Sequence, residues 1–324
     1  MLTQFVLLSV LCLTLIFSTG LIVSSLKDIA RRSKLNAFGV TALILAISTS
    51  LPELVVSLVA SIEGNTTLIL GNIVGSNIAD LSLVIGGAAL VGGTLKLSGD
   101  LLSRDIYLTG IAGFLPLFLI ADKTLSRQDG IVLLVVYVIM MSTFLRSHTQ
   151  SITQNAFSKT PIRRLISSIT NKNGHAGIYK FLLGVALLIT SSHFIVKLAQ
   201  VLATSTGLTP LFIGLFVVAV GTSLPELAFE MKAIRLGQVK MALGDLLGSV
   251  VANATLILGL SAFIRPILLT DSGLTPYTIS IIAFTLIYGV FILFVRTKKR
   301  LDWWEGLVLL ASYFAFIIIE FLRA

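Results

Sequence analysis

The hexapeptide TSLPEL occurs twice in this chain, at Thr49–Leu54 and again at Thr222–Leu227. Each copy lies inside an apolar stretch that is long enough to cross a membrane. Proline removes a hydrogen-bond donor from a helix, and an ionised glutamate is costly to bury in hydrocarbon. Because these two unfavourable residues stand together and the arrangement is repeated, the hexapeptide predicts a functional site inside a membrane-spanning fold.

The composition is that of a multi-span membrane protein. Of the 324 residues, 56% are hydrophobic and 12% are charged, and the mean hydropathy is +0.99. A soluble domain carries about 25% charged residues. The single cysteine, Cys12, cannot form an intrachain disulfide and is expected to serve only in packing. Ten apolar segments of roughly 18 to 27 residues are predicted to span the membrane, at 2–26, 36–62, 67–93, 104–121, 129–146, 178–204, 209–234, 240–264, 274–296 and 302–322.

The basic residues indicate an orientation. If the ten segments alternate in direction, 19 of the 24 Lys and Arg residues lie on one side. By the positive-inside rule that side is the cytoplasm, so both termini are predicted to lie outside the plasma membrane. The net charge of +9 then reflects topology and requires no nucleic-acid partner. The polar stretch 147–177 is predicted to be a cytoplasmic linker between a first unit, 1–146, and a second unit, 178–324.

The repeat extends beyond the hexapeptide. Residues 46–80 and 219–253 align without a gap at an offset of 173 and are identical at 14 of 35 positions. The copies lie five spans apart, so they enter the membrane in opposite directions. Inverted repeats with interrupted helices are typical of secondary transporters, whose site lies near the midplane. The sequence therefore predicts an all-α membrane protein of ten helices in two inverted five-helix repeats. Helices 2, 3, 7 and 8 are expected to be interrupted around the site.

The repeated residues place oxygen donors on shared helix faces. Pro52 and Pro225 each leave a carbonyl four residues earlier without its helical donor. Hydroxyl and carboxyl side chains three or four residues apart share a face, and two Gly-x-x-x-Gly pairs allow close helix packing. The side-chain ligands that this pattern predicts are Thr49, Ser50, Glu53, Ser76 and Asp80 in the first copy, and Thr222, Ser223, Glu226, Ser249 and Asn253 in the second.

This donor set indicates a hard cation. Oxygen ligands with high negative charge, and no Cys or His, suit Ca2+ better than zinc or copper. Carboxylates buried without a cation are unfavourable in a low-dielectric setting, so the empty site is expected to cross the membrane poorly. That penalty couples two ion fluxes without ATP, and the chain contains no G-x-x-x-x-G-K-[ST] motif. A transporter is predicted, neither an enzyme nor a protein with a bound cofactor.

The paired TSLPEL copies and the G-x-x-x-G-S elements resemble the two alpha repeats of the cation/calcium exchanger superfamily, in particular compact microbial sodium/calcium exchangers of ten helices. The resemblance implies a cluster of sites that takes either Ca2+ or several Na+, and sliding of the first and sixth helices. It implies the ten side chains above as ligands, together with the backbone carbonyls of Ala46 and Ala219.

Several positions depart from the family pattern. Asp80 and Asn253 are exchanged between the repeats, and Ser48 stands where the second copy has Gly221. Asp245 stands where an Asn is expected, as at Asn72 in the first copy. It is expected either to line the inner access path or to make an ordinary polar contact. Glu230, near Lys232, is interpreted as a solvated or ion-paired cytoplasmic helix end.

The function predicted from these features is electrogenic exchange of Na+ for Ca2+, in a lipid bilayer and with no obligatory protein partner. A Ca2+/H+ antiporter using the same carboxylates is the alternative, although the many hydroxyls favour Na+, because a proton needs only a carboxylate. An intramembrane aspartyl protease built on Asp80 and Asp245 is disfavoured, since it leaves both hexapeptides unexplained. An ion channel is disfavoured by the inverted repeat. Stoichiometry, direction, K+ dependence and oligomeric state stay open.

Overall fold

The computed structural model describes residues 2–32, 49–96, 100–149, 175–269, 271–298 and 300–323. Two predicted features fall outside these ranges. One is the first part of the second apolar segment, 36–48, which contains Ala46 and Ser48, and the other is 150–174, most of the predicted linker. The described residues are almost entirely helical, as predicted.

The helices and strands follow the apolar segments closely. The first half contains α1 (Leu2–Arg32), α3 (Leu51–Glu63), α4 (Thr66–Ala79), η1 (Asp80–Val84), α5 (Ile85–Gly92), β1 (Leu95–Lys96), α6 (Asp100–Leu119), η2 (Ile120–Asp122), β2 (Thr124–Leu125) and α7 (Arg127–Thr149). The second half contains α9 (His175–Thr206), α10 (Pro210–Ile213), η3 (Gly214–Val218), α11 (Ala219–Arg235), α12 (Val239–Val251), η4 (Ala252–Ile257), α13 (Leu258–Ile264), β3 (Ile267–Leu268), α14 (Asp271–Lys298), β4 (Arg300–Leu301) and α15 (Trp303–Phe321).

Within the described ranges, seven helical spans are long and apolar enough to cross a membrane. They are Thr66–Gly92, Arg104–Asp122, Tyr179–Thr206, Pro210–Arg235, Val239–Ile264, Tyr277–Lys298 and Trp303–Phe321. A shorter apolar stretch, Val6–Ile22, lies within α1. The chain is therefore a multi-pass membrane protein.

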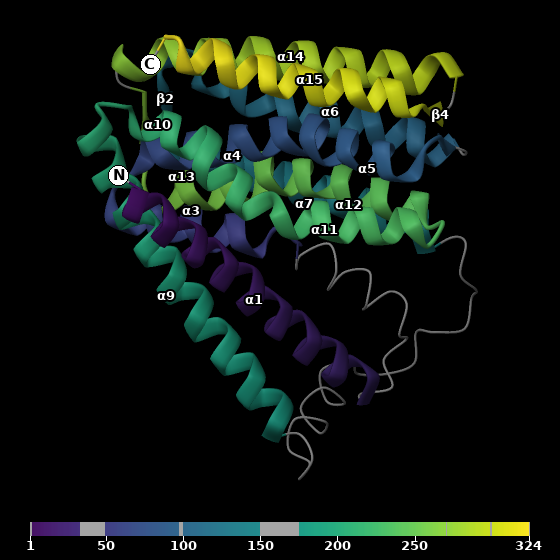
Figure 1. The fold of residues 1–324 in the computed structure, drawn as a ribbon, viewed down its shortest axis with the longest axis horizontal. Coiled ribbons are helices and arrows are strands. Elements are labelled where there is room, and N and C mark those ends of the chain that lie inside the picture. Colours follow the sequence, from purple (N-terminus) through teal and green to yellow (C-terminus); the bar gives the residue numbers. More distant parts are fainter. Residues whose placement is uncertain are drawn as a thin grey trace.

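The spans differ in how deeply they are buried. In the apolar 18-residue window of Thr66–Gly92, 94% of the residues are buried inside the protein, whereas the share is 33% in the corresponding windows of α14 and of α15. Figure 1 shows α14 and α15 side by side along one edge of the bundle, and α1 and α9 as a pair that leans away from it on the opposite edge. Helices α3, α4, α11 and α12 pack against one another in the interior. The two TSLPEL copies therefore lie at the centre of the molecule.

Glycines allow the central helices to touch through their backbones. A Cβ atom on Gly71 would lie 2.3 Å from the carbonyl oxygen of Leu211 and 3.0 Å from the Cα of Gly214. A Cβ on Gly75 would lie 2.4 Å from the carbonyl oxygen of Leu215. Glycine at positions 71 and 75 thus lets the backbone of α4 lie closer to the backbone of 211–215 than any larger residue would permit.

Two short antiparallel ribbons connect the halves of the chain. In one, β1 pairs with β4 and places Leu95 opposite Leu301; in the other, β2 pairs with β3 and places Leu125 opposite Ile267. All four of these apolar side chains are buried. Figure 1 shows β2 and β4 at opposite ends of the molecule. Each ribbon therefore joins one strand of the first half to one strand of the second, at its own end of the bundle.

The helices that follow β2 and β4 begin in the same way. The backbone N–H of Ser126 donates to Asp129 at 2.8 Å, and the N–H of Asp302 donates to Glu305 at 2.9 Å. A side chain three residues into each helix thus satisfies a free donor at its start. Matching glycines follow in both helices. They bring α7 against α13 (Gly130 with Gly259) and α15 against α5 (Gly306 with Gly86).

The expected interruptions of helices 2, 3, 7 and 8 are not confirmed as breaks. Helix α11 continues through Pro225, while α3 begins at Leu51 with Ser50 as its N-cap residue. In three places a helix instead widens into a π-helical turn, at η1, η3 and η4. Asp80 opens the turn η1, and Asn253 lies in η4. The helical spans therefore stay continuous at these two predicted site residues.

Hydroxyl groups stabilise the backbone beside two of these turns. Ser82 donates a hydrogen bond to the carbonyl of Ile78, and Thr255 donates to the carbonyl of Val251 at 2.6 Å. Hydrocarbon offers no water to hydrogen-bond the backbone of an irregular helical turn. Hydrogen bonds from Ser and Thr hydroxyls to a carbonyl one turn earlier add donors within the protein.

Candidate cation site

A cluster of polar side chains lies where α3, α4, α11 and α12 meet. It contains all ten side chains that the sequence predicts as ligands, and none of them is more than 6% exposed. Ala219, whose carbonyl was predicted as a ligand, is also buried, whereas Ala46 lies outside the described residues. The structure thus gathers the predicted side chains into one buried region.

The first hexapeptide touches a helix of the second half. The Thr49 hydroxyl lies 3.3 Å from Asp245 Oδ1 and 3.5 Å from the Ser249 hydroxyl. The Ser50 hydroxyl donates to Ser249 at 3.2 Å. These hydrogen bonds join the start of α3 to α12.

The second hexapeptide makes the equivalent contacts to the first half. The Thr222 hydroxyl lies 3.3 Å from Asn72 Oδ1 and 3.4 Å from the Ser76 hydroxyl. At the offset of 173, Thr222 corresponds to Thr49, and Asn72 and Ser76 correspond to Asp245 and Ser249. Each hexapeptide therefore contacts the glycine-containing helix of the opposite half.

The acidic side chains of the cluster have acceptor oxygens without partners. In the described part of the chain, both carboxylate oxygens of Glu53, one of Asp80 and one of Glu226 receive no hydrogen bond. Asp80 lies in η1 and Glu53 in α3, and both of these elements pack against α11, which carries Glu226. Buried like charges without partners are strongly unfavourable until a positive charge joins them. The cluster therefore has the chemistry of a cation site.

Hydroxyl and amide oxygens have to complete any ligand shell. In the described ranges, no three His, Cys, Asp or Glu side chains converge with the geometry of a metal centre. The amide oxygen of Asn253 also receives no hydrogen bond from the described residues and remains available as a ligand. A mixed shell of carboxylate, hydroxyl and amide oxygens is what Ca2+ accepts, because it binds six to eight oxygens in flexible geometry.

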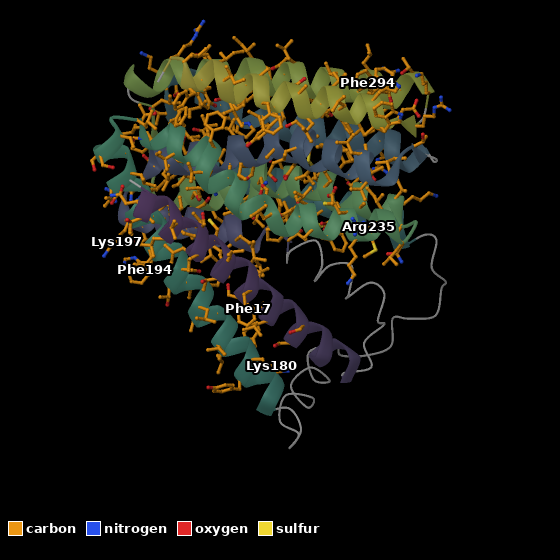
Figure 2. All side chains as sticks on the ribbon, viewed as in Figure 1. Phe17, Lys180, Phe194, Lys197, Arg235 and Phe294 are labelled. Carbon is orange, nitrogen blue, oxygen red and sulfur yellow. The ribbon has the colours of Figure 1, made fainter. Side chains whose placement is uncertain are left out.

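The interpretation of Glu230 is wrong. Its side chain is 0% exposed, and neither carboxylate oxygen has a hydrogen-bond partner or an ion pair in the described part of the chain. Helices α1, α5 and α12 pack against α11. Lys232 and Arg235, two and five residues after Glu230, are exposed, and Figure 2 shows Arg235 at one end of the molecule. Asp245 accepts a hydrogen bond from Thr49, which is the polar contact that sequence analysis considered. The sequence signal for Glu230 was its spacing of one helical turn from Glu226.

Helical spans that surround buried, unpaired carboxylates define a membrane transporter for cations. The kind of cation transporter follows from the family to which the sequence belongs. The chain belongs to the sodium/calcium exchanger family, whose sequence model matches residues 3–146 and 176–322. A member of this family is an exchanger and not an enzyme, as predicted, and the ions are its substrates rather than cofactors.

Individual relatives cover most of the chain. It is 29% identical to the sodium/calcium exchanger MaX1 of Methanosarcina acetivorans, over 92% of this chain and 93% of that protein. It is 34% identical to the inner membrane protein YrbG of Escherichia coli, over 71% and 72% of the two chains.

Solved structures share the fold. A structure of the sodium-calcium exchanger NCX_Mj, soaked with 10 mM Na+ and zero Ca2+, superposes with a TM-score of 0.63 at 22% identity, covering 98% of this chain and 99% of the other. The structure of native YfkE superposes with a TM-score of 0.68 at 19% identity, covering 98% and 92%.

Proposed function

We propose that this protein exchanges Na+ for Ca2+ across the plasma membrane by alternating access. The observation that carries the proposal is the set of carboxylate oxygens of Glu53, Asp80 and Glu226, at the junction of both halves, that receive no hydrogen bond from the described residues. Buried, ionised carboxylates are unfavourable without a cation. The protein therefore changes the side to which the site opens readily only when Ca2+ or several Na+ neutralise the carboxylates. The two fluxes are thereby coupled. MaX1, which matches nearly the whole chain, is named a sodium/calcium exchanger.

The ion ligands of this proposal are the ten buried side chains and the carbonyls of Ala46 and Ala219. Two observations support the side chains. They are buried together, and their hydroxyls already bridge the halves through Thr49 with Ser249 and Thr222 with Ser76. A cation between the halves would thus meet oxygens from both.

The proposed architecture is two inverted five-helix repeats, 1–146 and 178–324, joined by a linker at 147–177. Reciprocal contacts support it: β1 pairs with β4 while β2 pairs with β3, and the hexapeptide contacts are exchanged in the same manner. Contacts that occur twice with the partners exchanged are those expected of a twofold axis between two equivalent units.

The proposed orientation places both termini outside and the linker in the cytoplasm. It rests on the 19 of 24 basic residues that alternation assigns to one side. Figure 1 supports the alternation, because the labelled N and C ends lie at the same end of the molecule as β2 and opposite β4. Figure 2 likewise shows Lys197, assigned outside, and Arg235, assigned inside, at opposite ends of the molecule.

Helices α1 and α9 are proposed to slide during alternating access. They pack against each other and lean away from the bundle (Figure 1). Their contact with the core includes Cys12 against Gly221, where a Cβ atom on the glycine would lie 2.4 Å from the sulfur. Gly221 directly precedes the second hexapeptide, and its lack of a side chain leaves room for Cys12 where α1 packs against α11.

The test is uptake of radioactive Ca2+ into proteoliposomes that are loaded with Na+ and diluted into Na+-free buffer. We expect uptake that disappears when Na+ is equal on both sides. It should be faster when the vesicle interior is positive, because several Na+ leave for each Ca2+ that enters. Absence of Na+-driven uptake, with uptake driven instead by a pH gradient, would replace the proposal with Ca2+/H+ antiport on the same carboxylates.

A second arm tests the site. Glu53→Gln and Glu226→Gln are each expected to abolish Ca2+ uptake while the protein still elutes as a single species in size-exclusion chromatography. Glu320→Gln is the matched control, because Glu320 is also buried but lies near the end of α15, away from the cluster. Near-normal uptake in either of the first two variants would mean that the cation site lies elsewhere.

A further inference from the structure

Two equivalent pairs of side chains differ in charge between the halves. In the first half, Asn72 of α4 donates a hydrogen bond to the Ser57 hydroxyl of α3 at 3.2 Å, and both residues are fully buried. At the offset of 173, their counterparts are Asp245 of α12 and Glu230 of α11. A neutral, hydrogen-bonded pair in one half is therefore replaced by two carboxyl groups in the other.

The carboxyl pair is buried, and three of its four oxygens receive no hydrogen bond from the described residues. Glu230 is 0% exposed and Asp245 is 6% exposed. Both oxygens of Glu230 and Oδ2 of Asp245 receive no hydrogen bond from the residues that the structure describes. Helices α11 and α12, which carry Glu230 and Asp245, pack against each other. No described Lys or Arg forms an ion pair with either carboxylate.

The pair adjoins the central cluster but is distinct from it. Glu230 lies one helical turn beyond Glu226, and Asp245 lies one turn before Ser249. The second oxygen of Asp245 is already engaged by Thr49 at 3.3 Å. Because the equivalent residues Ser57 and Asn72 are hydrogen-bonded to each other, Glu230 and Asp245 are expected to lie close together. Two buried carboxylates at that separation repel each other and require a positive charge between them. All the groups available as ligands, the two carboxylates and the Thr49 hydroxyl, are oxygen donors, so the positive charge that suits them is a hard cation.

We propose that Glu230 and Asp245, together with the Thr49 hydroxyl, form an additional Ca2+ site beside the central cluster, toward the end of the molecule where α11 terminates. Its role as a loading point rests on the proposed exchange function, whereas its binding of Ca2+ does not. Because Ser57 and Asn72 occupy the equivalent positions, only one side of the exchanger has this site. Ca2+ approaching from the cytoplasmic side meets two more carboxylates than Ca2+ approaching from outside.

The first experiment measures radioactive Ca2+ bound in equilibrium dialysis of purified protein without Na+. In a Glu53→Gln, Glu226→Gln background, which removes two central carboxylates, we expect one Ca2+ to remain bound per chain. Adding Glu230→Ser and Asp245→Asn should remove it. These last changes install the pair that the first half already uses, so they are expected to preserve the fold. No Ca2+ bound by the background, or binding that persists after the added changes, overturns the proposal.

A second measurement covers the case in which the background variant fails to fold. Glu230→Ser with Asp245→Asn is made in the otherwise native chain, and the half-saturating Ca2+ concentration is measured from each face of oriented vesicles. We expect a rise of about tenfold at the cytoplasmic face, as for loss of charged ligand contacts, and no change at the other face. An equal shift on both faces, or no shift, contradicts an additional one-sided site.

The two proposals fail in different ways. Na+-driven uptake by the native chain, without Ca2+ binding that depends on Glu230, removes the additional site and leaves the exchange function intact. Ca2+ binding that depends on Glu230, without any Na+-driven uptake, removes the exchange function and leaves the additional site.

Discussion

The central carboxylates are placed unequally between two halves whose hexapeptides are identical. Glu53 and Glu226 occupy equivalent positions, but the third carboxylate, Asp80, has an amide, Asn253, as its counterpart. Both residues lie in π-helical turns, and each has an acceptor oxygen that receives no hydrogen bond from the described residues. The two positions are therefore alike in geometry and differ in charge. The total charge of the cluster should matter more than which half supplies it.

Exchanging the two residues tests this conclusion. Asp80→Asn is expected to lower the initial rate of Na+-driven Ca2+ uptake at least about tenfold, because a buried charged ligand is lost. Asp80→Asn combined with Asn253→Asp should recover most of the rate, since the third carboxylate returns at the equivalent position. The measurement is uptake into proteoliposomes at matched protein density. A double variant as inactive as Asp80→Asn would show that the side of the charge, and not the count, is decisive.

Sequence reasoning predicted the burial of the ligand side chains but not that of Glu230. The hexapeptide carries its own signal, because Pro and Glu together are unfavourable in a membrane helix unless they serve a site. Glu230 has no such context; it stands near Lys232, at the end of an apolar segment. Its burial depends on the helices that pack against α11, among them α5 and α12, and no local pattern encodes such tertiary contacts. The sequence held two clues: the spacing of one helical turn from Glu226, and the counterpart Ser57, which is small and compatible with a helix interface.

At the scale of elements, the irregular helical turns do not lie at the prolines, where the sequence predicts interruptions. Pro225 lacks a donor, yet α11 continues through it, and widened turns occur elsewhere, at 80–84, 214–218 and 252–257. Proline can be read from the sequence, whereas a π-helical turn has no residue signature. The hydroxyls of Ser82 and Thr255 that stabilise two such turns are common in any membrane helix. The ends of the helices were predictable, and their internal geometry was not.

Close backbone contact between α4 and the segment 211–215 predicts the effect of a single methyl group. Gly71→Ala would place Cβ 2.3 Å from the carbonyl oxygen of Leu211, so the two elements must move apart. We expect a loss of about 1–3 kcal/mol of stability, as for overpacked cores, seen as a lower midpoint of thermal unfolding in detergent. Gly289→Ala is the control, because its Cβ meets no described atom within 4 Å. Equal midpoints for the two variants would contradict the close packing.

At the scale of the whole molecule, the equivalence of the halves extends further than the sequence alignment. The aligned core keeps an offset of 173, but paired strands require others: Leu95 corresponds to Ile267, an offset of 172, and Leu125 to Leu301, an offset of 176. Small length changes in the connections therefore shift the register. An alignment at the fixed offset of 173 misses the identities that return at an offset of 176, such as Gly130 with Gly306 and Tyr137 with Tyr313. The strand pairs, the helix starts at Ser126 and Asp302, and the glycines Gly130 and Gly306 all show the correspondence.

The proposed topology can be tested with a pair of matched cysteines. The chain has one cysteine, Cys12, which is buried, so a Cys12→Ala parent offers no thiol. Gln128, at the start of α7, and Gln238, before α12, are both exposed. Alternation of ten spans places Gln128 outside and Gln238 in the cytoplasm. A membrane-impermeant maleimide should therefore label Gln128→Cys in intact cells and Gln238→Cys only in inverted vesicles. If the labelling pattern is reversed, the inverted repeats stand and the proposed orientation in the membrane is wrong. If both cysteines are labelled from the same side, the inverted arrangement of the repeats is contradicted.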